Sequence, residues 1–140
     1  VFDRKDINHY LSLGLSGVQM ATRFVATYEC DAAPEFKQMY VNAKKEDITL
    51  VNSPVHMVGR ALLNPFVKHI SQERLAPETC FHCLKTCDPR TTQYCISMAL
   101  IRAARGDVDH ALIFCGANAW RVDKIMSVHD LMTELTSDPE

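Results

Sequence analysis

The 140-residue sequence lacks the features that mark several classes of protein. Its charges nearly cancel, with 15 lysines and arginines against 17 aspartates and glutamates, and neither sign is clustered. This balance gives no indication of a nucleic-acid-binding surface or of an acidic tail. No apolar run approaches the ~18 residues that a membrane-spanning helix needs, and no internal repeat is visible. We therefore expect one domain, or a piece of one, that binds neither nucleic acid nor membrane.

A secretory signal is also missing. Residues 1–4 lack the basic-then-apolar layout of a signal peptide. Six cysteines without such a signal favour a reducing compartment, where thiols serve metal or redox chemistry instead of disulfides. We expect a cytoplasmic protein, and its 47% hydrophobic content suffices for a core.

Helices and strands alternate along the chain. Apolar residues at helical spacing, together with capping residues, predict helices over residues 4–13, 34–44, 64–73, 94–105 and 128–135. Short runs rich in β-branched residues predict strands over residues 18–20, 48–51 and within 55–63. Residues 111–115 are apolar, and their pattern fits a strand or the end of a helix. The mixture indicates an α/β protein.

The segment from Gly17 to Phe24 carries the most informative local pattern. A buried strand over residues 18–20 would run directly into a helix that starts near Thr22. The first N–H groups of a helix have no partner within it, and the helix dipole favours an anion there. A phosphate could therefore bind at this turn. The alternative is an ordinary strand–helix junction in which Thr22 only caps the helix.

Four of the six cysteines lie close together in the chain. They are Cys80, Cys83, Cys87 and Cys95. The first three fall in a polar loop, and the fourth begins a predicted helix. Thiolates at this spacing can converge on one zinc ion or on one [4Fe–4S] cluster. The same spacing also allows a set of redox-active or simply reduced thiols.

Two further segments could contact a small molecule. Arg60 follows Gly59 and could bind an anionic substrate. Gly116 would let the backbone approach a ligand closely, and Asn118 could hydrogen-bond a planar ring. The alternatives are a surface arginine and a plain turn.

Three stretches together carry a family resemblance: GVQMATRF at residues 17–24, SPVHMVGRA at residues 53–61 and GANAWRV at residues 116–122. They resemble the nitronate monooxygenase (2-nitropropane dioxygenase-like) family, which includes the FMN-dependent enoyl-acyl-carrier-protein reductases. The resemblance covers nearly the whole chain. It implies a TIM barrel with an inserted or appended substrate domain, and non-covalently bound FMN.

The resemblance also implies roles for particular residues. Residues 18–20 would be a late strand of the barrel, in line with the usual position of phosphate sites in barrel enzymes. The residues implied to hold the FMN phosphate are Gln19, Met20, Ala21 and Thr22. The chain would be the C-terminal part of the barrel, since the family's Gly-Gly phosphate element would precede Val1. Residues 1–32 would then belong to the FMN barrel, and residues 33–140 to an appended region with the cysteine loop.

The predicted function is that of a fragment of an FMN-dependent oxidoreductase. It would act on a small molecule, either an alkyl nitronate oxidised with O₂ or an enoyl thioester reduced with NAD(P)H. FMN would supply the redox chemistry. Arg60 and Asn118 are the candidate residues of the substrate pocket, and no catalytic residue is assigned. The alternative is a metal-stabilised binding module, organised by the four cysteines and without flavin.

Overall fold

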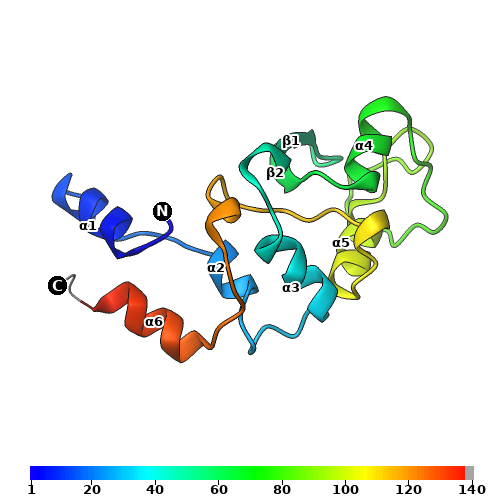
Figure 1. Cartoon of the computed structure of the whole chain (residues 1–140). Coiled ribbons are helices and arrows are strands. Elements are labelled where there is room, and N and C mark those ends of the chain that lie inside the picture. The colour runs from blue at the N-terminus through cyan, green and yellow to red at the C-terminus, as the bar shows by residue number, and fades with distance from the viewer. Residues whose placement is uncertain (138–140) are drawn as a thin grey trace.

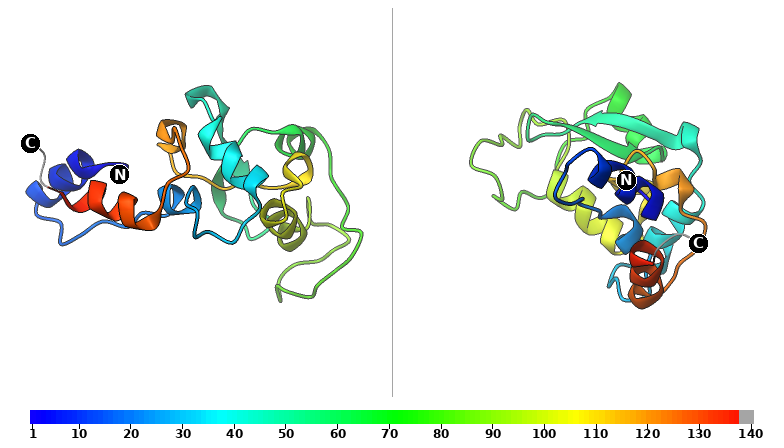
Figure 2. Two further views of the ribbon diagram at one scale, coloured as in Figure 1. Left: turned by 60° about the horizontal axis from the view of Figure 1, so that its bottom comes forward. Right: turned by 90° about the vertical axis from the view of Figure 1, so that its left-hand side faces the viewer.

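A computed structural model describes residues 1–137 as an elongated molecule (Figure 1). Its helices, 3₁₀ helices and strands are α1 (Arg4–Ser12), α2 (Thr22–Val25), α3 (Pro34–Val41), η1 (Lys45–Asp47), β1 (Ile48–Asn52), β2 (Val58–Leu62), α4 (Pro65–Gln72), α5 (Ile96–Ala104), η2 (Val108–His110), η3 (Ala119–Arg121) and α6 (Val128–Thr136). Figure 1 and the left view of Figure 2 place α1 and α6, which are in contact, at one end of the molecule. The hairpin of β1 and β2, with α4 and α5, forms the other end, and α2 and α3 lie between the two ends.

The predicted helices are confirmed, and side-chain caps explain several of their starts. The Asp3 carboxylate accepts the Asp6 N–H at 2.9 Å and begins α1. The Ser127 hydroxyl accepts the Asp130 N–H at 3.0 Å and begins α6. Such caps satisfy N–H groups that the first turn of a helix leaves unpaired. Within residues 1–137, no helix has the length and apolar character that crossing a membrane requires.

The strands predicted over residues 48–51 and within 55–63 are confirmed as β1 and β2. They pair antiparallel, with Ile48 opposite Leu62 and Asn52 opposite Val58. Residues 111–115, whose pattern fitted a strand or a helix end, run extended beside β2. There the Leu62 N–H donates to the Ile113 carbonyl at 2.9 Å, and Phe114 forms a bridge with Ala61.

The strand predicted over residues 18–20 is wrong. This segment forms no strand in the described structure, although α2 does begin at Thr22 as expected. A β-strand forms only where its backbone hydrogen-bonds to a neighbouring strand. Within residues 1–137, no neighbouring strand lies beside this segment. The sheet of the described chain is two-stranded and antiparallel. The barrel itself is therefore not present in residues 1–137.

A few buried polar groups form hydrogen bonds that connect the elements in the middle of the molecule. The Tyr40 hydroxyl of α3 donates to the Phe114 carbonyl at 2.6 Å, and burial raises the pKa of Tyr40. The ammonium of Lys37, which is 8% exposed, donates to the Thr27 carbonyl at 2.8 Å. Thr27 also bridges to Met126 in the segment before α6. These contacts attach both Phe114 and Thr27, which lies two residues after α2, to helix α3.

Candidate functional site

Two segments that are far apart in the sequence line one cleft of about 470 Å³. Its lining residues are Val1, Phe2, Gln19, Met20, Ala21, Thr22, Arg23, Val25 and the run from Phe114 to Ala119. Cofactor and ligand sites usually occupy roughly 300–1,000 Å³. We call this space the shared cleft, and its two walls are residues 19–22 and residues 116–118.

Gly116 and Thr22 join the two walls directly. The Gly116 N–H donates to the Thr22 hydroxyl oxygen at 2.8 Å, across 94 positions of sequence. A methyl group placed on Gly116 would lie 3.2 Å from the same oxygen. Gly116 therefore permits a close approach of its backbone to Thr22, and the expected approach to a ligand stays a prediction.

The wall at residues 19–22 contains backbone N–H groups that have no hydrogen-bond partner within residues 1–137. The hydrogen bonds within residues 1–137 use none of the N–H groups of Gln19, Met20, Ala21 and Thr22, whereas two N–H groups further along α2 are used. Those of Phe24 and Val25 donate to the Ala21 carbonyl at 2.9 and 3.2 Å. Successive backbone N–H groups beside a cleft are suited to bind phosphate. Because α2 is a single turn, these N–H groups would contribute more than its dipole.

The structure brings together some of the predicted site residues and leaves others apart. Asn118 lies in the shared cleft with the four residues of the opposite wall. Arg60 is exposed on β2 and lies outside this lining, although its backbone carbonyl accepts the Cys115 N–H at 2.9 Å. Gly17 is exposed, and a methyl group placed on it would meet nothing within 4 Å. The glycine that permits close approach is Gly116, and Gly17 has no such role here.

Sequence reasoning missed Phe2 and Cys115, which also line the shared cleft. Phe2 precedes the first helix and belongs to no motif, so no sequence signal identifies it. Cys115 adjoins the glycine-containing run at residues 116–122, and that neighbourhood could have identified it. Burial raises the pKa of Cys115 to about 11, and the positive charge of Arg60 opposes this rise.

The four clustered cysteines line a second cleft of about 230 Å³. The sulfur of Cys83 accepts the Ser97 hydroxyl at 3.0 Å, and that of Cys80 accepts the His82 N–H at 3.4 Å. Within residues 1–137, no three His, Cys, Asp or Glu side chains are placed so that they could hold a metal ion. The structure therefore does not support the expected zinc ion or [4Fe–4S] cluster at Cys80, Cys83, Cys87 and Cys95. Thiolates of a metal site must converge on one centre, whereas these line a cleft as free thiols.

Comparison with protein families tests the family membership that the three sequence motifs indicated. The family model for nitronate monooxygenase matches residues 1–138. The chain belongs to the nitronate monooxygenase family. The resemblance stated from the three sequence stretches is confirmed.

Solved structures of FabK from Thermotoga maritima are similar to this family member. One is 25% identical with a TM-score of 0.75, covering 96% of this chain and 40% of that chain. The M276A mutant is 26% identical with a TM-score of 0.73, covering 96% and 38%. The chain thus spans about two fifths of the length of these structures. No curated protein matched it. The mixed helices and strands fit a portion of an α/β barrel protein of this family.

Proposed function

We propose that this chain supplies the phosphate end of the FMN site in an FMN-dependent oxidoreductase. The observation that carries the proposal is the shared cleft, which is lined both by four successive residues whose N–H groups have no partner within residues 1–137 and by the wall that contains Gly116. Membership of the nitronate monooxygenase family supports FMN as the ligand.

The residues of the shared cleft fit a phosphate. The Thr22 oxygen already accepts the Gly116 N–H, so its hydroxyl hydrogen is available to donate to a phosphate oxygen. The two arginines nearest the walls are paired, Arg23 with Glu134 and Arg121 with Asp3 and Asp6. The anion would therefore be held by neutral backbone dipoles and a hydroxyl group, and no free guanidinium is needed.

FMN supplies electron transfer when it is bound, and the chain supplies binding and orientation. The Asn118 side chain in the shared cleft offers both an N–H donor and a carbonyl acceptor to a planar ring. Cys115 is protonated near neutral pH because burial raises its pKa to about 11. Since the thiolate is the reactive form of cysteine, Cys115 serves as part of the wall and does not act as a nucleophile.

The substrate of the proposed reaction is an alkyl nitronate, oxidised with O₂. The name of the matching family supports this choice. An enoyl thioester, reduced with NAD(P)H, is the second candidate, because the same three motifs resemble the FMN-dependent enoyl reductases. Arg60 lies outside the shared cleft, so Asn118 is the better candidate for contact with substrate.

The test is made on the full-length polypeptide that contains this chain. It is mixed with FMN and desalted, and its visible spectrum is recorded. We expect the two absorbance bands of oxidised flavin to remain with the protein, and a colourless protein would refute the proposal. Oxygen uptake with an alkyl nitronate, compared with NAD(P)H oxidation in the presence of a short enoyl thioester without O₂, then distinguishes the two substrates.

A further inference from the structure

Arg23 directly follows the proposed phosphate-binding wall in sequence, and both Nη atoms of its guanidinium group have hydrogen-bond partners. The residue is 8% exposed. Its two Nη atoms donate to the two carboxylate oxygens of Glu134 at 2.7 and 3.0 Å. Nη1 also donates to the Phe2 carbonyl at 3.3 Å. Because both Nη atoms are occupied, Arg23 is a poor candidate for a direct phosphate ligand.

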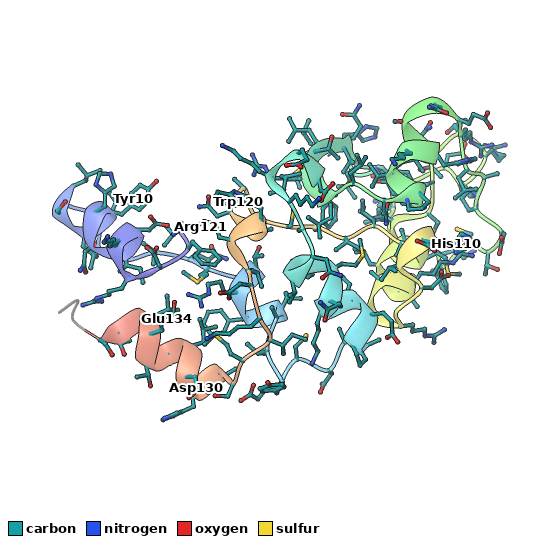
Figure 3. The ribbon with its side chains drawn as sticks, in the orientation of Figure 1. Tyr10, His110, Trp120, Arg121, Asp130 and Glu134 are labelled. Carbon is teal, nitrogen blue, oxygen red and sulfur yellow. The ribbon has the colours of Figure 1, made fainter. Side chains whose placement is uncertain are left out.

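A second arginine, Arg121, follows the opposite wall in sequence, and carboxylates hold its guanidinium group in a similar way. Arg121 of η3 donates from one Nη atom to Asp3, and from the other to Asp6 at 3.1 Å. The guanidinium carbons of Arg23 and Arg121 lie 4.6 and 4.4 Å from the centroid of the same Phe2 ring. Figure 3 shows Arg121 and Glu134 in the region between η3, α1 and α6. One aromatic ring, itself part of the cleft lining, thus contacts the arginine that follows each of the two walls in sequence.

We propose that the Arg23–Glu134 pair is a positioning device, which holds the wall at residues 19–22 against the wall at residues 116–118. The pair fixes Arg23, and Thr22, the residue immediately before it, carries the hydroxyl oxygen that accepts the Gly116 N–H. Through Glu134, which lies 111 positions away in sequence, helix α6 becomes part of the site. Only the identity of the ligand rests on the proposed function, since the contact between the walls is independent of it.

Removal of the Glu134 charge would leave the largely buried guanidinium of Arg23 without its ionic partner. An unpaired charge in this position is costly, and the chain relieves the cost by moving the arginine toward water. Movement of Arg23 displaces Thr22 and opens the cross-wall hydrogen bond. The affinity of the shared cleft then falls although no group that touches the phosphate has changed.

The experiment uses Glu134→Gln in the full-length polypeptide, with two readouts. The first is hydrogen exchange at the Gly116 amide, measured relative to the Leu112 amide, which donates to the Ala99 carbonyl in the core. We expect the Gly116 amide to exchange about tenfold faster, since its acceptor is displaced by local opening. The second is the dissociation constant of FMN, which we expect to rise about tenfold.

Asp130→Asn is the matched control. It removes the same charge from the same helix, and the Asp130 carboxylate forms no hydrogen bond or ion pair that the structure records within residues 1–137. Figure 3 shows Asp130 on the part of α6 that lies away from Arg121. We expect this variant to match the wild type in both readouts. Arg23→Lys keeps the charge but loses the two-pronged geometry, and we expect it to reproduce the effects of Glu134→Gln.

The proposal is overturned if Glu134→Gln and Arg23→Lys lower the melting temperature but leave the Gly116 exchange ratio unchanged, since the pair would then be merely structural. If the wild-type protein binds no FMN, the proposed function fails, and the exchange ratio still decides this inference. If Glu134→Gln does not fold, the same measurements are made on Arg23→Lys.

Discussion

At Gly116 the absence of a side chain determines how closely two distant segments meet. The amide of this residue reaches the Thr22 hydroxyl, and a methyl group would crowd the same oxygen at 3.2 Å. Residues that permit a contact in this way are as much a part of a site as those that touch the ligand. Gly17, in the stretch with the strongest family resemblance, has no such role.

Gly116→Ala is expected to weaken FMN binding. The added methyl group forces the walls apart, and overpacking of this kind costs about 1–3 kcal/mol. Quenching of FMN fluorescence on titration measures the affinity. Gly17→Ala is the control, because its methyl group would meet nothing within 4 Å. Equal affinities for the two variants would contradict the role assigned to Gly116.

The cysteines should differ strongly in reactivity. Cys83 is exposed, whereas burial raises the pKa of Cys115 to about 11. Because thiolates react and thiols do not, a disulfide reagent at pH 8 should modify Cys83 in a fast phase and Cys115 in a slow one. Cys83→Ser should remove the fast phase. Loss of that phase in Cys115→Ser instead would show that the burial of the two residues has been misassigned.

At the scale of elements, β2 depends on the absence of a side chain at Gly59. A methyl group placed there would lie 2.4 Å from a ring carbon of Phe114, in the extended segment beside β2. We expect Gly59→Ala to lower the free energy of unfolding by about 1–3 kcal/mol, because the ring has to move. Urea denaturation measures the change. A change as small as that of Gly17→Ala would show that the ring moves freely.

The N-caps of α4 and α6 form a matched pair with different burial. Asn64 accepts the Val67 N–H, and its amide also donates to the Val108 and Ala111 carbonyls at 2.6 and 2.8 Å. Asn64→Ala removes the cap and leaves these two carbonyls unpaired, which costs about 1–3 kcal/mol beyond the cap itself.

Ser127→Ala removes only a cap, so we expect a loss of about 1 kcal/mol in the free energy of unfolding. Denaturation of the two alanine variants side by side measures the difference. The larger loss should belong to Asn64→Ala, since the Asn64 side chain joins α4 to the segment around η2, whereas that of Ser127 serves its own helix. The reverse order would contradict this account of Asn64.

At the scale of the whole molecule, ion pairs join the N-terminal helix, the walls of the cleft and the C-terminal helix. The Arg23 hydrogen bond lowers the pKa of Glu134 below its ordinary value of 4.5. The backbone N–H of Asp6, and then Arg121, lower the pKa of Asp3 below its ordinary 3.8. A carboxyl group whose pKa is lowered in the folded state stabilises the fold at pH values above its ordinary pKa. This stabilisation is lost as the pH falls through the lowered pKa of the folded state.

The melting temperature should therefore fall as the pH drops from about 5 toward 3. Glu134→Gln should show a shallower fall, because it lacks one of the groups that take up a proton on unfolding. The difference will be modest, since the Glu134 side chain is 45% exposed and water screens the pair. Thermal melts followed by circular dichroism measure it. Parallel curves for the variant and the wild type would contradict the assignment.

The sequence by itself determined the local structure and the family. Caps such as Asp3 and Ser127 and the runs of β1 and β2 act over a few residues, so their patterns predicted elements that are confirmed. The motifs likewise identified the family that the comparison confirms. The division of the chain at residue 32 stays a prediction.

Tertiary structure alone decided the rest, because each of these features depends on a partner that is distant in sequence. Residues 18–20 have strand composition but no neighbouring strand within residues 1–137, so they form none. The cysteine spacing permits a metal, yet the cysteines line a cleft without the convergence that a metal needs. Arg23 pairs with Glu134 at a separation of 111 positions, and no local pattern encodes that contact.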